Sequence, residues 1–348
     1  MVTISASVGQ GGVNKKADAL AIQQALNKIP PHKGGPDPKL VEDGLVGPKT
    51  INAIRKFQQS DIALVKDGRV DVNGPTLARI NAQLGNGTST GPKFTEKTLY
   101  GAGGPSVNDI KQDSFGDCYF VATLGAVAQQ NPKGIKDAIY YDSSTQQFRV
   151  RLYKLNGQVK YIWVTQAELE DNVNRQGGSW VDNTGLYERF WPAVIETAYA
   201  KMFDSNPNDG LGEGYQKIIN GGWPSDAMMA ITGNAGSQVG YKYYLKLGVD
   251  GSVAILGGKV ATALQQHKSV TLWSVPEKGS VQDGLVDDHV YTVISMTQKG
   301  TDWNVTVRNP WGTNMGVGEG KDQTSAIMTL SLRNLVTTGG LQSFRVSN

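Results

Sequence analysis

Four residues have the side-chain types and the spacing that nucleophilic catalysis needs, beginning with Cys118. Cys118 is the only cysteine, and it stands directly before an apolar run, YFVATLGAVA, that predicts a helix. The free amides at a helix start stabilise a thiolate, so we expect the pKa of this thiol to be lowered. An isolated cysteine is otherwise most often an inert buried residue, and Cys118 alone does not decide between these two interpretations.

A thiolate nucleophile needs a base that takes up its proton and later protonates the leaving amine, and histidine suits both steps near neutral pH. His289 directly precedes VYTVISM, whose alternation predicts a strand. His267 lies in a polar stretch and His32 in a Gly- and Pro-rich loop, so both are expected at the surface. His289 is therefore the candidate base, although a hydrogen-bonded core histidine would fit the same position.

Asn309 and Gln112 complete the set. Asn309 ends a second alternating segment twenty positions after His289, so adjacent strands would bring its amide to the imidazole and fix the tautomer of the ring. Trp311 follows and would cover the pair. Gln112 stands six positions before Cys118, where its amide would meet an oxyanion together with the Cys118 N–H. By itself, the Asn-Pro-Trp-Gly string is typical of a turn that ends a strand.

The composition restricts the remaining possibilities. The 348 residues carry 34 Lys and Arg against 31 Asp and Glu, a net charge of +3 that predicts no nucleic-acid or anionic-lipid partner. No apolar run is long enough to span a membrane, and the first sixteen residues lack the apolar region of a signal peptide. One cysteine excludes an internal disulfide, and together with three scattered histidines it offers no paired ligands, so no metal site is expected.

The first part of the chain predicts a small helical module, residues 1–85. Three short helical patterns lie between Ala17 and Leu84. Two loops, Asp43–Thr50 and Asp67–Thr76, each combine an Asp-Gly turn with a Gly-Pro at the expected helix start, which is a weak internal repeat. The small and polar residues that follow, GNGTSTGPK, predict a linker, which we place at residues 86–98.

The segments of this module carry a resemblance to a known family. The order of SVGQGGVNKKADALAIQQALN, DGLVGPKTINAIRKFQQS and DGRVDVNGPTLARINAQL resembles the three-helix peptidoglycan-binding module of bacteria. The resemblance implies that residues 1–85 bind peptidoglycan and that the protein is bacterial. Members of this family also serve as general adaptors or prodomains, so restraint of the rest of the chain is a second possibility.

A second resemblance covers roughly residues 101–346, which are similar to the calpain family of papain-like cysteine proteases. Five segments occur in the order of the family: KQDSFGDCYF, FWPAVIETAYAKM, IINGGWPSDAMMAITG, GLVDDHVYTV and VRNPWG. The resemblance implies Cys118 as nucleophile, His289 as general base and acid, Asn309 as the residue that orients the histidine, and Gln112 as oxyanion donor.

The calpain resemblance also implies an α+β fold in which residues 99–348 form two lobes. A helical lobe, about residues 99–222, would carry the cysteine. An antiparallel, β-rich lobe, about residues 223–348, would carry the histidine and the asparagine, with substrate extended across the cleft between the lobes.

The chain departs from the calpain pattern at positions that face substrate. Tyr119 replaces the usual Trp after the nucleophile, and Asp288 replaces the Gly before the histidine. Gly222 matches a glycine that pairs with the substrate backbone in the family. We expect Gly222, Trp311 and Asp288 to contact substrate, and the Asp288 carboxylate to favour basic side chains near the scissile bond.

A further departure concerns calcium. Calcium-dependent calpains hold the ion with an Asp that matches Asp109 and with a Glu that is here Arg189. Because calcium sites gather anionic oxygens, a cation at this position disfavours the site. We therefore expect activity without calcium or any other cofactor.

The leading interpretation is a cysteine endopeptidase that cleaves proteins or peptides through a thioester and is targeted or restrained by the N-terminal module. One alternative is a hydrolase of peptidoglycan stem peptides, which shares the Cys-His chemistry. Another is a non-catalytic wall-binding protein. A module that binds cell wall predicts an exported protein, extracellular or periplasmic.

Overall fold

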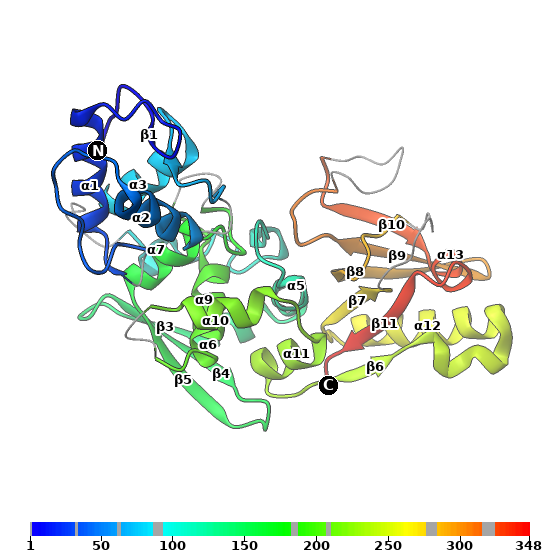
Figure 1. Ribbon diagram of the computed structural model, residues 1–348. Helices are drawn as coiled ribbons and strands as arrows, with labels where there is room; N and C mark the ends of the chain where they lie inside the picture. Colours follow the sequence, from blue (N-terminus) through cyan, green and yellow to red (C-terminus); the bar gives the residue numbers. More distant parts are fainter. Residues whose placement is uncertain are drawn as a thin grey trace. The chain divides into compact units, whose positions relative to one another are not determined.

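The computed structural model describes residues 2–31, 34–60, 64–85, 93–181, 187–206, 210–275, 284–314 and 324–348. The chain forms two compact units (Figure 1). The first comprises Met1–Lys93 with Asp204–Glu213, and the second comprises Phe94–Phe203 with Gly214–Asn348. His32 and residues 86–92 of the expected linker lie outside the described residues. No described helix combines the length and the apolar character that crossing a bilayer requires.

The first unit contains the three helices predicted from the sequence, which are α1 (Lys16–Lys28), α2 (Pro48–Gln59) and α3 (Pro75–Gly85). Both α2 and α3 begin with proline, whose fixed φ suits the first helical turn, as the Gly-Pro pairs predicted. A short strand pair, β1 (Val8–Gly9) with β2 (Arg69–Val70), was not predicted. The helices pack around a core of their own. Its fully buried members include Ile22, Leu26, Ile54, Phe57 and Ile80.

The first Asp-Gly loop is fastened to α1 by one buried side chain, Gln23. Its Nε2 donates to Asp43 Oδ1 at 2.9 Å, to the Leu45 carbonyl at 3.0 Å and to Thr50 Oγ1 at 3.4 Å. Its Oε1 accepts from the Gly44 N–H at 2.8 Å. A single amide therefore satisfies the turn and the first residues of α2 at once.

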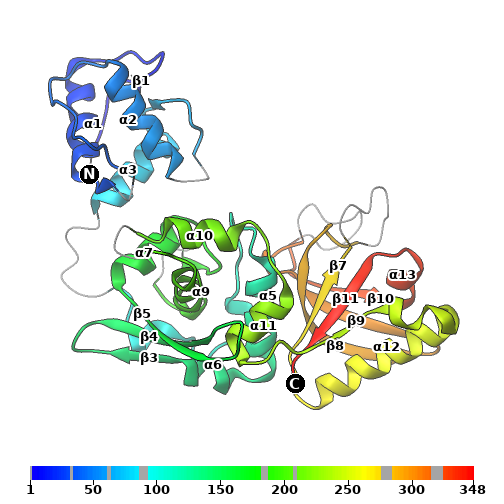
Figure 2. The same cartoon turned by 60° about the horizontal axis from the view of Figure 1, so that its bottom comes forward.

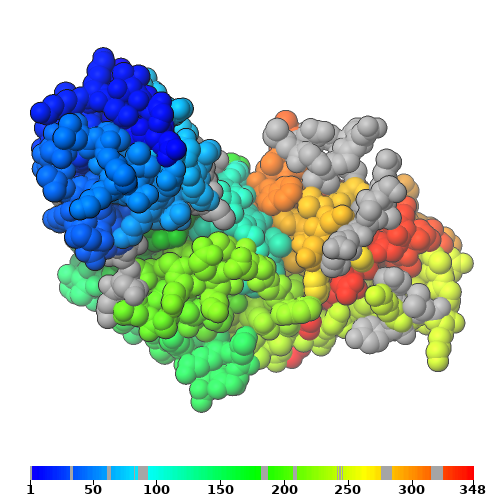
Figure 3. Space-filling view, viewed as in Figure 1, coloured from blue at the N-terminus to red at the C-terminus, as the bar shows by residue number. Residues whose placement is uncertain are grey.

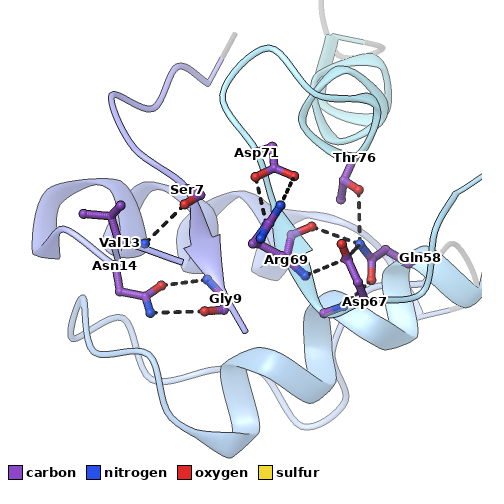
Figure 4. A network of polar contacts seen from close by, with 10 residues as sticks. Ser7, Gly9, Val13, Asn14, Gln58, Asp67, Arg69, Asp71 and Thr76 are labelled. Atoms are coloured by element: carbon purple, nitrogen blue, oxygen red, sulfur yellow. Dashed lines mark hydrogen bonds and ion pairs between the residues drawn. The ribbon is translucent and has the colours of Figure 1, made fainter. Parts of the chain in front are cut away.

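Gln58 on α2 repeats this arrangement for the second loop (Figure 4). Its Nε2 donates to Asp67 Oδ1 at 2.8 Å, to the Arg69 carbonyl at 3.0 Å and to Thr76 Oγ1 at 3.2 Å. Its Oε1 accepts from the Gly68 N–H at 2.8 Å. The weak internal repeat predicted from the two Asp-Gly loops therefore includes a hydrogen-bond network, in which Gln58 makes the contacts that Gln23 makes in the first loop.

The helical lobe of the second unit is built around two buried helices, α5 (Cys118–Gln130) and α9 (Trp191–Met202). Residues 119–128 and 191–200 are all buried, which is the pattern of helices that are packed on every side. An antiparallel sheet in the order β3-β4-β5, absent from the prediction, covers part of the lobe. Its strands are Ile139–Asp142, Gln147–Tyr153 and Val159–Val164. The other helical elements are α4 (Glu96–Leu99), η2 (Val107–Asp109), α6 (Pro132–Ala138), α7 (Gln166–Asn174), α10 (Gly212–Ile219) and α11 (Pro224–Thr232).

The β lobe is a six-stranded antiparallel sheet in the order β10-β9-β8-β7-β11-β6. Its strands are β6 (Ser237–Val239), β7 (Val270–Ser274), β8 (Val290–Lys299), β9 (Asp302–Arg308), β10 (Ile327–Ser331) and β11 (Leu341–Val346). Helix α12 (Gly248–Gln265) lies along one face of the sheet, as Figure 2 shows, and η3 (Tyr241–Leu247) and α13 (Leu332–Thr337) flank it. A glycine permits the close approach, because a Cβ on Gly257 would lie 2.3 Å from the Trp303 ring. The α+β arrangement expected from the sequence is confirmed.

Two expected boundaries shift. Phe94, which we assigned to the linker, is fully buried with its ring 5.1 Å from Tyr187 and 4.9 Å from Phe190, so the packed unit begins at residue 94. Helix α11 packs against α5 and β4 through buried residues such as Met228, so the helical lobe extends past residue 222 to the end of α11. An apolar helix face belongs to the core that covers it, and sequence spacing alone does not reveal which core that is.

The two lobes of this unit are joined directly beside Cys118. Thr292 Oγ1 on β8 donates to the Ala122 carbonyl of α5 at 2.7 Å. Arg308 at the end of β9 donates through Nη2 to the Ile110 carbonyl at 2.8 Å. In Figure 3 the teal surface of the helical lobe borders the orange surface of the β lobe. The start of β8 therefore holds α5, and the end of β9 holds the segment that leads to the cysteine.

Candidate active site

Cys118 is the first residue of α5, as predicted, and it is half-buried. Asp117 precedes it as the N-cap residue. The loop before the cysteine runs close to the end of α10, because a Cβ on Gly116 would lie 2.3 Å from the Ile219 carbonyl oxygen. Any larger residue at 116 would push this loop away. The thiol thus stands at the start of a buried helix, behind a loop that tolerates little movement.

The acidity of the thiol differs from our expectation. Burial raises the pKa of Cys118 to about 12, although its sulfur accepts from the N–H groups of Val290 and Tyr119, which oppose the rise. The nearby carboxyls of Asp117 and Asp288 raise the pKa further. The expected lowering by the helix start is therefore outweighed, because loss of water around a half-buried sulfur disfavours the thiolate more than the helix amides favour it.

His289 lies immediately before β8 and is buried, with 4% of its surface exposed. Ser274 on β7 fixes its backbone: the His289 N–H donates to Ser274 Oγ at 2.9 Å, and the His289 carbonyl accepts from the Ser274 N–H at 3.0 Å. The imidazole packs edge-on against Tyr291 and tilted against Trp311, with both ring centroids 4.8 Å away. Strand pairing and two aromatic rings thus hold the imidazole in one orientation.

Asn309 follows β9 and is fully buried. Because β8 and β9 are antiparallel neighbours, as predicted, the residue after one strand lies beside the residue before the other. Asn309 Oδ1 lies 3.0 Å from His289 Nε2 and also accepts from the Trp311 N–H at 3.1 Å. A carbonyl oxygen only accepts, so His289 Nε2 carries the proton and Nδ1 is left to act as acceptor.

Burial also controls the charge of the histidine. It lowers the pKa of His289 to about 4, against the opposing effects of the Asn309 hydrogen bond and the Asp288 carboxylate. Burial therefore disfavours the charged forms of both side chains, the thiolate of Cys118 and the imidazolium of His289. The Cys118 sulfur accepts from the backbone N–H of Val290, the residue after His289, so the thiol lies beside the backbone at the start of β8.

Gln112 is buried close to Cys118, but its amide is engaged. Nε2 donates to the Phe115 carbonyl at 2.6 Å and to Asp117 Oδ1 at 3.3 Å. The two N–H bonds of the amide are thus directed into the loop before Cys118. An oxyanion would have to replace the longer of these contacts, the one to Asp117.

Gly222, Asp288 and Trp311, the three residues expected to contact substrate, have neighbours next to or within the Cys118 and His289 segments. Gly222 packs against the ring of Tyr119, since a Cβ there would lie 2.5 Å from it. Asp288 is exposed and has a φ of 46°, which is unusual outside glycine. Its Oδ1 accepts from Trp273 Nε1 at 3.0 Å, and Trp273 packs edge-on against Trp223 at 5.2 Å. The carboxylate is therefore held beside His289 by an aromatic pair.

Trp311 covers His289 and borders an open pocket of about 430 Å³ on the side of Gln112. The pocket is lined by polar and charged side chains except for Trp311 itself. They are Lys111, Gln112, Asp113, Ser114, Gln176 and Thr313. Lys111 and Asp113 form an ion pair at its wall.

Comparison with known proteins identifies the fold and the chemistry. Residues 91–331, more than half of the chain, match the pattern of the calpain family cysteine protease domain. The chain belongs to the calpain family of cysteine proteases. The matched region contains every residue of the site, and the cysteine-type endopeptidase chemistry expected from the sequence is thereby supported at family level.

This calpain-family protease is similar to proteins from animals and bacteria. It is 29% identical to calpain-13 of Rattus norvegicus over 223 residues, 60% of this chain and 30% of that protein. It is 25% identical to a thiol protease of Porphyromonas gingivalis over 226 residues, 61% of this chain and 45% of that protein. Calpain clp-4 of Caenorhabditis elegans is 27% identical over 225 residues, 60% and 28%. The chain therefore spans less than half the length of these relatives.

Asp109, which matches a calcium ligand of calcium-dependent calpains, is engaged in hydrogen bonds within the protein. Asp109 is buried and its Oδ2 already accepts from Trp191 Nε1 at 2.8 Å and from the Ser106 N–H at 2.9 Å. Burial raises the pKa of Asp109, while the nearby Arg189 cation opposes that rise. A guanidinium therefore supplies the positive charge beside this carboxyl. Across the described ranges, no cluster of three or more His, Cys, Asp or Glu side chains is arranged as metal ligands.

Some residues of the site escaped the sequence analysis. Ser274 fixes the backbone of His289, and Trp273 holds Asp288, yet each is an ordinary strand residue in the sequence. Glu196 gave a clearer signal, because it is the one acidic residue in the apolar helix WPAVIETAYAKM, and it lies fully buried behind Asp117.

Proposed function

We propose that this protease hydrolyses peptide bonds of proteins with Cys118 as nucleophile, His289 as general base and acid, and Asn309 as the residue that orients the histidine. The observation that carries the proposal is the 3.0 Å contact between His289 Nε2 and Asn309 Oδ1, beside the thiol of Cys118. With Nε2 occupied, Nδ1 is the nitrogen available to the thiol proton.

Because burial disfavours both the thiolate and the imidazolium, we infer that the proton moves as the sulfur attacks. His289 Nδ1 takes the proton of Cys118 as the sulfur attacks the scissile carbonyl, which forms the tetrahedral intermediate. The imidazolium then protonates the leaving amine, the C–N bond breaks, and a thioester remains. A water molecule that gives its proton to His289 attacks the thioester and releases the carboxylic acid and the thiol. Asn309 holds the ring in line throughout.

Gln112 supports oxyanion stabilisation together with the Cys118 N–H. Its longer contact, 3.3 Å to Asp117 Oδ1, is the hydrogen bond that an oxyanion would replace. Gly222 would pair with the substrate backbone, and Trp311 would shield the His289–Asn309 hydrogen bond from water. The exposed Asp288 carboxylate is held by Trp273, which packs against the exposed ring of Trp223, and it suits a basic side chain of the substrate.

The proposed activity does not depend on calcium. Support comes from Arg189, whose guanidinium lies by the buried Asp109 carboxyl where a metal-dependent relative would place an ion. We infer that the Arg189 side chain supplies, beside Asp109, the positive charge that calcium would supply in such a relative. Proteolysis should be equal in buffer with excess chelator and in buffer with added calcium, and a reversible loss in chelator would contradict this proposal.

Residues 1–85 are proposed to bind peptidoglycan and to direct or restrain the protease at the cell wall of a bacterium, which implies an exported protein. Support comes from the order of the motifs and from the two glutamine networks that fix the Asp-Gly loops. Those loops present exposed apolar side chains, such as Leu45 and Val72. The full chain with Cys118→Ala should sediment with purified sacculi if this proposal holds.

The activity is tested with unfolded casein as substrate, with the Cys118→Ala chain as control and purified sacculi as a second substrate. Cleavage of casein that is lost in the variant would support the endopeptidase. Release of stem peptides from sacculi with intact casein would instead support a hydrolase of the cell wall. Failure to cleave either substrate, by the full chain and after separation of residues 1–90, would support a non-catalytic binding protein.

A further inference from the structure

Two carboxyl groups meet behind the nucleophile. Asp117, the residue before Cys118, and Glu196, in the middle of α9, are both 0% exposed. Their carboxyls are hydrogen-bonded to each other. The mechanism proposed above assigns neither of them a role. Because two buried carboxylates in contact repel strongly, one of the two must carry a proton near neutral pH.

The donors around the pair decide which carboxyl is charged. Glu196 accepts from the Gly178 N–H at 3.0 and 3.1 Å through its two oxygens, and Oε2 also accepts from Asn172 Nδ2. The Asp117 carboxyl accepts the long contact from Gln112 at Oδ1 and a hydrogen bond from its own backbone N–H, and Oδ2 has no donor among the described residues. Hydrogen bonds to the charged form favour it, so the charge lies on Glu196 and the proton on Asp117.

The backbone near Glu196 is shaped for a carboxylate. A Cβ on Gly177 would lie 2.3 Å from Glu196 Oε2, and a Cβ on Gly178 would lie 2.9 Å from Oε1. Only glycines therefore let the chain close over these oxygens and aim the Gly178 N–H at both of them. The two glycines thus let the backbone stabilise a charged Glu196 carboxylate. Glu196 lies on α9, whereas Asp117 directly precedes Cys118.

We propose that Glu196 keeps Asp117 protonated, and that the neutral Asp117 spares the Cys118 thiolate from an adjacent negative charge while it holds the amide of Gln112. Asp117 and Glu196 are then positioning residues that act on the nucleophile through charge and through the loop. A charged Asp117 would raise the pKa of Cys118, because a second negative charge next to the sulfur disfavours the thiolate. The proposal rests on Cys118 as the reactive thiol and adds how its reactivity is protected.

The other titratable groups near Asp117 and Glu196 are three phenols and one carboxyl, and none of them carries a positive charge that would let both carboxyls ionise. The phenols lie on α5, α9 and α10, and burial raises the pKa of each, so they stay neutral over the same pH range. Asp113, on the loop before Cys118, adds negative charge near Glu196 and so strengthens the need for the shared proton. The phenols belong to Tyr119, Tyr199 and Tyr215.

The test is the rate of alkylation of Cys118 by iodoacetamide as a function of pH, measured on the full chain without substrate. Asp117→Asn keeps a neutral donor toward Glu196, so its rate profile should match that of the unmodified chain. Glu196→Gln offers an N–H to Asp117 and lets it ionise, so alkylation at a given pH should slow about tenfold and the profile should move to higher pH. The double variant, neutral at both positions, should return to the unmodified profile.

Two results would overturn the proposal. Faster alkylation in Asp117→Asn, with an unchanged profile in Glu196→Gln, would place the charge on Asp117 in the native chain. Unchanged profiles in both single variants would mean that the pair does not act on the thiol. Should Glu196→Gln fail to fold, Asp117→Asn still shows whether Asp117 is charged in the native chain, because its alkylation would be faster only in that case. Alkylation is read without proteolysis, so a chain that cleaves no protein still answers the question.

Discussion

Asn309 Oδ1 accepts from His289 Nε2 at 3.0 Å, and the same oxygen accepts from the Trp311 N–H at 3.1 Å. The second bond fixes which atom of the amide faces the imidazole, because an N–H group in that place would repel the Trp311 amide. One backbone N–H therefore determines the orientation of Asn309, and Asn309 determines the tautomer of His289. Strand geometry thus leaves Nδ1 as the ring nitrogen of His289 that is free to accept a proton.

Asn309→Ala should lower kcat by roughly tenfold to a thousandfold, since the imidazole loses the partner that fixes its tautomer. KM should change little, because Asn309 is fully buried. Steady-state kinetics on a peptide substrate measure both values. Asn156→Ala, at an exposed turn between β4 and β5, is the matched control and should behave as the unmodified chain. An equal effect of both changes would contradict the role of Asn309.

His289 should make stability depend on pH. Its pKa is lowered from 6.5 to about 4 in the folded chain, so between these values the unfolded chain binds more protons and stability falls as the pH falls. From pH 7 to pH 5 this single group should cost about 2 kcal/mol of unfolding free energy. Denaturant unfolding of the native chain and of His289→Gln at both pH values measures the difference. Equal pH dependence of the two chains would show that His289 is not held neutral.

Gly116→Ala should impair the site, because the added Cβ would lie 2.3 Å from the Ile219 carbonyl and would displace the loop before Cys118. We expect a loss of about 1–3 kcal/mol in stability and a larger proportional loss of activity. Gly103→Ala, where an added Cβ meets nothing within 4 Å, is the control. Thermal unfolding and peptide hydrolysis report the two effects, and a fully active Gly116→Ala chain would refute the argument.

Gln58→Ala should destabilise the first unit by about 1–3 kcal/mol, because it leaves the Gly68 N–H and the Asp67 carboxylate without their buried partner. Gln59→Ala changes the neighbouring exposed glutamine and should be neutral. Urea unfolding of the full chain, followed by hydrogen exchange in α2 and α3, measures the loss. Two equally stable variants would mean that the network adds nothing to the fold.

Asp288→Asn should reduce kcat/KM for peptides with Lys or Arg near the scissile bond about tenfold and leave Glu-containing peptides unaffected or improved. The reason is the loss of the negative charge that Trp273 holds beside His289. Matched peptide pairs that differ only in this side chain provide the measurement. Equal turnover of the Lys and Glu peptides by the unmodified chain would already exclude the preference.

Much of the site was predictable because its chemistry depends on residue types at element ends. Cys118 begins an apolar helix, and His289 and Asn309 flank adjacent antiparallel strands that bring their side chains within hydrogen-bond distance. The acidity of Cys118 was predicted with the wrong sign, since burial is a property of the packed lobes and not of the helix start. The networks of Gln23 and Gln58 escaped prediction because an amide in a helix does not reveal which loop it will meet.

The burial of α5 on every side ties the position of the Cys118 sulfur to the stability of the core. A nucleophile on a loop can move without disturbing the rest of the protein. Here the sulfur lies on a buried helix, which the hydrogen bond from Thr292 to the Ala122 carbonyl links to the β lobe. A substitution that changes the packing anywhere along α5 is therefore expected to disturb the position of the sulfur as well as the core. We therefore expect activity to be lost when the core of the helical lobe is destabilised. Substitutions that prolong activity at high temperature are expected among the buried residues around α5.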